Sequence, residues 1–463
     1  MNPALNWREL IGMVNKVLLV MFFLSSVHLA KAQHEQHHKS QAESDQNEED
    51  SARGYVLPMS HAFSLTLPMS RNGSGTGWLP DSSPMYGYML SHKKWVYMFH
   101  GNLFIRYNKQ DITEKGSRGD EKIDAPNWLM GMGQRRVGER GLFRFSIMMS
   151  LDPLIAGGSG YPLLFQSGET YKGKKLVDRQ HPHDLFSELS VGYSHRFDSN
   201  MDLFFYLGYP GEPALGPVAF MHRVSALNNP DALLGHHWQD ATHITFGVAT
   251  IGFRYKSLKI EGSSFTGREP DEERYGFDKP RFDSYSFMFS INPNSNLAFQ
   301  ASQGFLKNPE GLGDNVKRTT ASILYNFPLF PLIKKNYNFS TSLIWGYNNS
   351  GHNHQEHSIS FEPAVQLNKW AIYGRHEWVQ KSSEELDITL EEDKTFNIQA
   401  YTVGFNYTLV RHWNINFTLG TQGTFFKNPN DLYSIYGKNP LSAEVYLRIN
   451  PSIMNMGKKE HGH

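Results

Sequence analysis

Residues 397–407 read NIQAYTVGFNY, and this stretch shows the pattern that decides the fold. One set of alternate residues is smaller and more polar: Ile398, Ala400, Thr402, Gly404 and Asn406. The other set is larger and mostly apolar: Gln399, Tyr401, Val403, Phe405 and Tyr407. Because successive side chains of a strand point to opposite faces, the stretch predicts a β-strand with one face toward water and one toward lipid.

The same alternation continues along the chain. In 413–419 the apolar residues Trp413, Ile415, Phe417 and Leu419 alternate with Asn414, Asn416 and Thr418. Sixteen strand candidates are found: 95–107, 127–135, 142–151, 185–197, 201–208, 244–255, 258–265, 284–291, 297–304, 320–327, 337–346, 358–366, 370–379, 397–410, 413–421 and 441–449. In hydrocarbon every backbone polar group must be paired within the protein, so strands with a lipid face must close into a barrel.

The connections between these strands alternate in length. The short ones are 198–200, 256–257, 292–296, 367–369 and 411–412, and the long ones are 152–184, 209–243, 266–283, 305–319, 347–357, 380–396 and 422–440. Outer-membrane barrels have short periplasmic turns and long outer loops. We therefore predict an all-β, transmembrane antiparallel β-barrel of about sixteen strands (range 14–18) with long extracellular or lumenal loops. A soluble all-β protein is the alternative.

The N-terminus predicts export. The apolar run 17–24 (VLLVMFFL) follows Arg8 and Lys16 and precedes Ala30-Lys31-Ala32, which is typical of a cleavable signal peptide over 1–32. An uncleaved anchor helix is the alternative. Residues 33–53 then form a His/acidic tail without large apolar residues, which predicts disorder. We expect 54–91 to be a lumenal plug or an extra hairpin, 92–450 the barrel and 451–463 a tail, in the outer membrane of a Gram-negative bacterium.

Composition excludes several classes of function. The 45 basic and 45 acidic residues balance, which argues against nucleic acid as a partner, and the absence of cysteine excludes disulfide and thiolate metal sites. Serine-hydrolase, zinc-protease and phosphate-loop motifs are missing, so we expect a protein that is not an enzyme and whose partners include outer-membrane lipid.

Two long loops concentrate histidines and carboxylates, which are ligands for borderline transition metals. His181 and His183 alternate, so an extended segment would point both the same way, and the spacing of His236, Asp240 and His243 would place them on one face of a short helix. The candidate metal ligands are His181, His183, Asp184, His222, His236, His237, Asp240 and His243. The structural alternative is a polar network that orders the loops.

Methionine gives a weaker indication. Met59, His61, Met69 and Met85 lie in the 54–91 stretch, and thioether with imidazole suits Cu(I) or Ag(I). Methionine as apolar filler is the alternative.

The loop motifs 160–166 (GYPLLFQ), 178–184 (DRQHPHD), 206–218 (YLGYPGEPALGPV), 235–245 (GHHWQDATHIT) and 265–270 (FTGREP) resemble those of a family of uncharacterised bacterial outer-membrane β-barrel proteins. Members of that family are often associated with copper- or silver-handling loci. The resemblance covers about a quarter of the chain and implies a role in metal efflux or tolerance, with metal-efflux components as partners. It supplies no ligand assignment.

Three functions therefore stay open. The first is a non-enzymatic outer-membrane barrel that binds a transition metal ion (Cu, Ag or Zn) for efflux or tolerance. The second is a passive, porin-like channel for a small polar or anionic solute, whose lumen would be lined by Arg135, Arg136, Arg140, Arg144, Arg179 and Arg223. The third is a structural surface protein.

Overall fold

The computed structural model describes residues 59–311, 313–329, 336–351, 355–389 and 394–454. The predicted signal peptide, the acidic tail, residues 54–58 and residues 455–463 lie outside these ranges. No helix among the described residues is long and apolar enough to cross a membrane.

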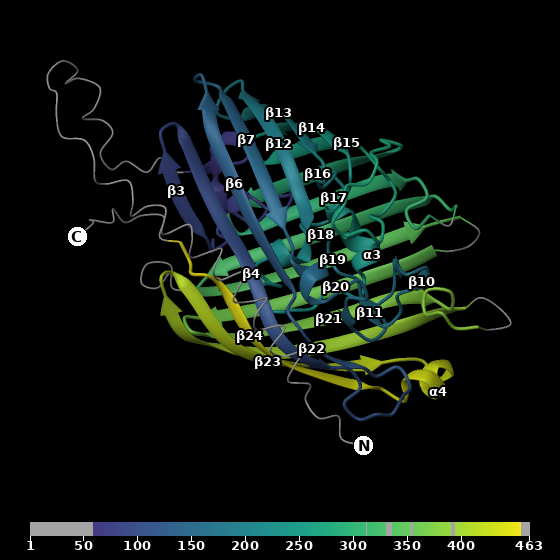
Figure 1. Cartoon of the computed structure of the whole chain (residues 1–463). Helices are drawn as coiled ribbons and strands as arrows, with labels where there is room; N and C mark the ends of the chain where they lie inside the picture. Colours follow the sequence, from purple (N-terminus) through teal and green to yellow (C-terminus); the bar gives the residue numbers. More distant parts are fainter. Residues whose placement is uncertain (1–58, 312, 330–335, 352–354, 390–393, 455–463) are drawn as a thin grey trace, which may run out of the picture. The chain divides into compact units, whose positions relative to one another are not determined.

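Antiparallel strands close into a barrel in which spatial neighbours follow the order of the chain (Figure 1). Within the described ranges, sixteen strands form the wall: β4 (Trp95–Lys109), β6 (Asn127–Val137), β7 (Gly141–Met149), β12 (Phe186–Arg196), β13 (Met201–Gly208), β14 (Val248–Tyr255), β15 (Leu258–Phe265), β16 (Ser284–Asn294), β17 (Leu297–Leu306), β18 (Val316–Pro328), β19 (Tyr337–Asn349), β20 (Gln355–Leu367), β21 (Trp370–Ser382), β22 (Thr395–His412), β23 (Ile415–Lys427) and β24 (Leu441–Pro451). The predicted fold class and strand number are confirmed.

The first and last wall strands close the ring. β24 pairs with the second half of β4, for example Val445 with Tyr107, while β6 pairs with the other edge of β4. Two short strands, β3 (Tyr88–His92) and β5 (Glu121–Asp124), pair with the remaining lengths of those two edges. Closure leaves the wall without a free edge, as a membrane barrel requires.

The wall is inverted relative to a soluble barrel, because its small and polar residues are buried and its large apolar residues are exposed. In β22, Ala400, Thr402 and Asn406 are buried, whereas Val403 is 67% exposed and Phe405 41% exposed. This assigns the polar set of the 397–407 stretch to the lumen and the apolar set to the outside.

The loop between β13 and β14, residues 209–247, is nearly all buried and is called the inner loop. It contains η2 (Phe220–His222), α3 (His236–Gln239) and η3 (Ala241–His243). Figure 1 shows α3 beside β18 and β19, and its residues contact β18, β19 and β20. The predicted strand 244–255 therefore begins only at Val248, because residues 244–247 complete the inner loop, with Thr245 bridged to Gly211.

Buried ion pairs join the inner loop to strands on different sides of the wall. Asp231 lies 2.6 Å from Arg106 of β4, and Arg223 donates to Glu362 of β20 at 2.9 Å. Arg375 of β21 donates to the carbonyl oxygen of Asp231 at 2.9 Å and also pairs with Glu362. The loop, which leaves the wall at β13 and β14, thus crosses the lumen and is fixed to strands far around the ring.

Residues 59–87, the N-terminal inner segment, line another part of the interior. This segment contains β1 (Ser60–His61), β2 (Ser64–Pro68) and η1 (Met69–Arg71). Lys259 of β15 donates to the carbonyl oxygen of Thr76, and Asn292 of β16 donates to that of Leu79 at 2.9 Å. The remaining short elements lie in loops: α2 (Asp152–Ile155), β8 (Tyr161–Pro162), β9 (Thr170–Tyr171), β10 (Lys174–Lys175), β11 (Arg179–Gln180), η4 (Asn430–Leu432) and α4 (Tyr433–Tyr436).

Candidate metal site

Five histidines from two loops gather at the long-loop end of the barrel. His181 and His183 follow β11, His236 and His237 begin α3, and His243 ends η3. The strict alternation of turns places both loops at the same end of the wall, so residues more than fifty positions apart meet.

The imidazole rings form a continuous cluster. The ring centroids of His181 lie 5.7 Å from those of both His236 and His237, and His236 and His237 are 5.1 Å apart. His243 lies 5.2 Å from His236 and 5.5 Å from His183. One ring nitrogen each of His181, His236 and His237 lies within 4.8 Å of the others, a spacing that lets three side chains reach a common ion.

Each ring is oriented through its Nδ1 atom. Four of the five bind a carboxylate there: His236 to Asp240 at 2.7 Å, His183 to Asp152 at 2.8 Å, His181 to Glu169 at 3.1 Å and His237 to Glu269 at 3.3 Å. The Nδ1 atom of His243 lies 2.7 Å from the carbonyl oxygen of Asp240. Metal-binding histidines usually carry this kind of contact, which fixes the tautomer and makes the other nitrogen more basic.

Four of the five opposite nitrogens have no hydrogen-bond partner among the described residues. The Nε2 atoms of His181, His183, His237 and His243 are buried, and none has a hydrogen-bond partner among the described residues. A buried polar atom without a partner is costly, so four in one cluster need an explanation. A loop-ordering network would satisfy both nitrogens of each ring, which these contacts do not do.

Burial also sets the protonation states. It lowers the pKa of His181 and of His236 below the ordinary value, and the pKa of His243 to about 3. Burial opposes protonation of His237 too, but Glu269, Glu169 and Glu385 together outweigh it and raise the pKa of His237. Most of the cluster is therefore neutral at pH 7, the form in which imidazole coordinates metals.

Gly168 permits the close packing around His237. Its φ is +110°, and a Cβ at this position would lie 2.2 Å from the Nε2 atom of His237. Only glycine combines this backbone conformation with that approach.

The remaining predicted ligands lie elsewhere. His222 lies near Trp128 and His100, with ring centroids 4.8 and 5.7 Å away. Asp184 pairs with Arg274 at 3.3 Å. Asp240 supports His236 and also contacts Arg223 at 3.4 Å, so its place is behind the imidazoles.

Sequence reasoning missed the supporting carboxylates Asp152, Glu169 and Glu269. Glu269 lies in the FTGREP motif, which was quoted for the family resemblance, and the other two lie in the loop that carries His181. Their position in these loop motifs is therefore the signal by which the sequence could have indicated these carboxylates.

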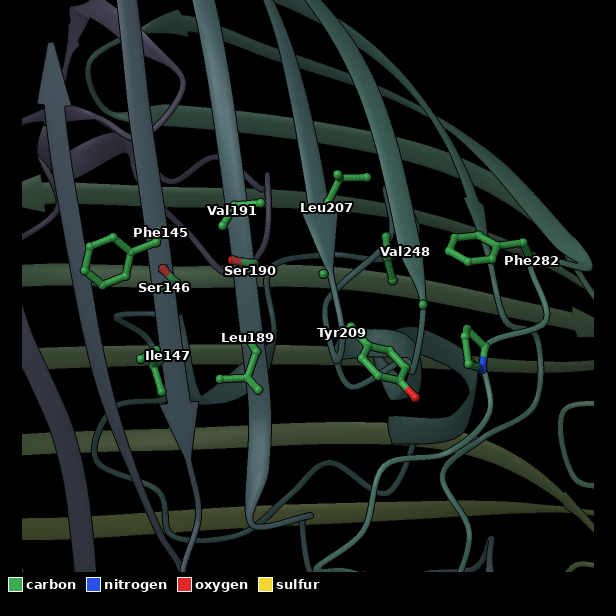
Figure 2. Close-up of a pocket in the computed structure, with 13 residues that line it drawn as sticks. Phe145, Ser146, Ile147, Leu189, Ser190, Val191, Leu207, Tyr209, Val248 and Phe282 are labelled. Atoms are coloured by element: carbon green, nitrogen blue, oxygen red, sulfur yellow. The ribbon is translucent and has the colours of Figure 1, made fainter. Parts of the chain in front are cut away.

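A hollow on the outside of the wall is lined mainly by apolar side chains. It measures about 570 Å³ and is lined by side chains of β7, β12, β13 and β14 and by Pro280 and Phe282. Figure 2 shows Phe145, Val191 and Leu207 on neighbouring strands around it. Among the described residues that line it, none is a histidine or a carboxylate.

Comparisons with known proteins give only distant similarities. No protein-family model and no curated protein matches the chain, so the family resemblance stays a prediction. Among solved structures, Salmonella typhi OmpF in complex with daunomycin is 9% identical and covers 78% of this chain and 100% of its own, with a TM-score of 0.48. Two further structures give similar values. An anion-selective porin from Comamonas acidovorans is 10% identical and covers 77% of this chain and 99% of its own, with a TM-score of 0.45. OmpT of Vibrio cholerae is 9% identical and covers 78% of this chain and 100% of its own, with a TM-score of 0.44. All three TM-scores are below 0.5, so these similarities assign neither solute nor ligand to this chain.

Proposed function

We propose that this chain is an outer-membrane barrel that binds a divalent transition metal ion through His181, His236 and His237. The observation that carries the proposal is that His181 and His237 combine carboxylate contacts at Nδ1 with buried Nε2 atoms that have no partner among the described residues. His183 and His243 adjoin the three and complete the donor set at its edge.

Membrane placement is supported by the inverted wall. Alternate exposed side chains on adjacent strands are large and apolar, for example Leu207 (55%), Ile251 (49%) and Ile260 (56%). A contiguous apolar exterior of this kind costs free energy in water and is stable in lipid.

The donor set favours Zn²⁺, Cu²⁺ or Ni²⁺ over hard cations. Imidazole nitrogens suit these metals, whereas Mg²⁺ and Ca²⁺ prefer oxygen. The inner loop crosses the lumen and is held to the wall by buried ion pairs. The proposed role is therefore capture or retention of the metal at the cell surface, which agrees with a role in metal tolerance.

Calorimetric titration of the detergent-solubilised full mature chain with Zn²⁺ and Cu²⁺ tests the proposal. We expect one tight equivalent that H181A/H236A/H237A loses. The control is H92A/H195A/H412A, which removes three histidines at the short-turn end, outside the cluster. Both variants retain the 33–38 histidines, so their difference isolates the cluster. Equal binding by the two variants would overturn the proposal.

A passive channel is the second candidate, and the size of the wall supports it. Sixteen-strand barrels commonly leave an aqueous pore. The arginines that would select an anion are however already engaged in part: Arg144 pairs with Glu188 at 3.0 Å and Arg179 with Asp120 at 2.5 Å. Ohmic conductance in planar bilayers, insensitive to Zn²⁺, would favour the channel over the metal-binding protein.

A further inference from the structure

A cavity of about 80 Å³ lies between the N-terminal inner segment, the inner loop and strands β4, β6 and β24. It is separate from the histidine cluster, because none of the five clustered histidines lines it. Its lining includes four methionines and two histidines: Met85, Met98, Met132, Met221, His100 and His222.

The two imidazoles face each other. The ring centroids of His100 and His222 lie 5.7 Å apart, and Trp128 packs against both at 5.1 and 4.8 Å. The Nε2 atom of His100 is buried without a hydrogen-bond partner among the described residues. This unused donor distinguishes the cavity from a simple apolar cluster.

The charge of the lining restricts the ligand further. Among the described residues no carboxylate lines the cavity, and the one charged residue there is Arg223, which pairs with Glu362 and Asp240. A divalent ion would therefore find no compensating negative charge. Neutral thioether and imidazole donors suit a soft, singly charged cation instead.

Methionine as filler is the usual explanation for such side chains, and the same barrel offers an example of it. Met130 and Met148 pack against Phe220, Ala226 and Leu233 of the inner loop, in an apolar cluster that also contains Met221 and borders Met132. Neither of them lines the Met/His cavity. The methionines that face His100 and His222 differ because they share their cavity with an unsatisfied imidazole.

We propose that this cavity is a second metal site, specific for a soft monovalent d¹⁰ cation such as Cu(I) or Ag(I) and held by Met98, Met132 and Met221 with His100 and His222. The strand residues Met98 and Met132 lie near the short-turn end of the wall, whereas the histidine cluster lies in the long loops. The barrel would thus hold borderline and soft ions at different levels.

Silver ion is the probe, because it does not change oxidation state under aerobic conditions. Titration of the full mature chain with Ag⁺ compares M98L/M132L with M130L/M148L. Each variant replaces two methionines of adjacent wall strands by residues of similar volume, a change that folded cores usually tolerate. Circular dichroism and the heat-dependent shift on denaturing gels would show that both barrels are folded.

We expect M98L/M132L to lose one silver equivalent, or to bind it at least about tenfold more weakly, while M130L/M148L matches wild type. X-ray absorption at the silver edge should show sulfur neighbours in wild type that M98L/M132L loses. Unchanged silver stoichiometry and affinity in M98L/M132L would overturn the proposal. So would a silver spectrum without sulfur.

The outcome is independent of the histidine cluster. The variant H181A/H236A/H237A should still bind this silver equivalent, and M98L/M132L should still bind Zn²⁺ as wild type does. If H181A/H236A/H237A still binds Zn²⁺ as wild type does, the histidine cluster is wrong. If M98L/M132L still binds the silver equivalent, the Met/His cavity is wrong.

Discussion

The Nδ1 atom of His236 lies 2.7 Å from Oδ1 of Asp240, at the centre of the inner loop. The other carboxylate oxygen of Asp240 accepts a hydrogen bond from the backbone N–H of Phe220 at 3.1 Å and contacts Arg223 at 3.4 Å. Arg223 is in turn bound to Glu362 of the wall. One short chain of contacts therefore connects the orientation of an imidazole to the barrel itself.

Replacing Asp240 by asparagine should weaken Zn²⁺ binding by about 10- to 100-fold, the usual effect of removing a carboxylate behind a metal-binding histidine. The charge that makes His236 more basic is lost while the side-chain shape is kept. Calorimetric titration measures the effect. Asp198→Asn, in an exposed turn at the opposite end, is the control and should bind as wild type.

Gly168→Ala should abolish or strongly weaken binding, because the new methyl group would lie 2.2 Å from Nε2 of His237. Gly173→Ala is a close control: Gly173 lies in the same loop with φ +70°, and nothing lies within 4 Å of its Cβ position. Both changes strain a left-handed residue, but only one blocks the imidazole. Similar Zn²⁺ affinities for both would contradict the site.

Metal binding near pH 6 should release about one proton, because His237 has a raised pKa and is protonated first on acidification. The lowered pKa values of His181 and His236 keep those rings neutral. Affinity should therefore fall with acidification, but less steeply than for three ordinary histidines. Calorimetry in buffers of different ionisation enthalpy counts the protons. A release of about three protons would show that burial does not keep His181 and His236 neutral in the metal-free protein.

Glu362→Ala should loosen the inner loop, because it leaves Arg223 and Arg375 buried without their shared carboxylate. Breaking a buried ion pair on one side typically costs about 3–5 kcal/mol. We expect a lower thermal midpoint and new conductance in planar bilayers. Glu384→Ala removes an exposed pair with Lys175, and such a surface pair contributes little, so neither property should change.

Val403→Lys should impair membrane assembly, because Val403 is 67% exposed on the outer face in the middle of β22. A lysine at the membrane midplane costs about 2–4 kcal/mol. Val410→Lys lies on the same strand near the turn, where the cost falls to about 0–1 kcal/mol. Folding into lipid vesicles compares the two. Equal folding yields would argue against a lipid-facing wall.

The wall was predictable because its pattern is local. The alternation of residue types in stretches such as 397–407 predicts which face of the strand each residue occupies. The lengths of the connections predict at which end of the barrel each connection lies. The strand start near residue 244 was wrong by four residues, since the apolar side chains Ile244 and Phe246 are buried as part of the inner loop. Period alone cannot distinguish a wall strand from an apolar loop enclosed by the wall.

The site was predictable only in part. Density of histidine indicated the two loops, but the helix assumed for residues 236–243 is broken, because α3 ends at Gln239 and a separate turn carries His243. His236 and Asp240 still meet at the i, i+4 spacing. The contacts of His181 with Glu169, and of His237 with Glu269, depend on how three loops pack, which no spacing in the sequence encodes.

The closure between β4 and β24 sets an order of assembly. The inner loop is complete by residue 247, whereas its partners Arg375, Asn406 and Arg448 come much later in the chain. After the first and last strands have paired, a loop of this size cannot enter the lumen. The inner loop must therefore be in place before the barrel closes. Substitutions of those late partners should reduce assembly of the protein before they alter metal binding.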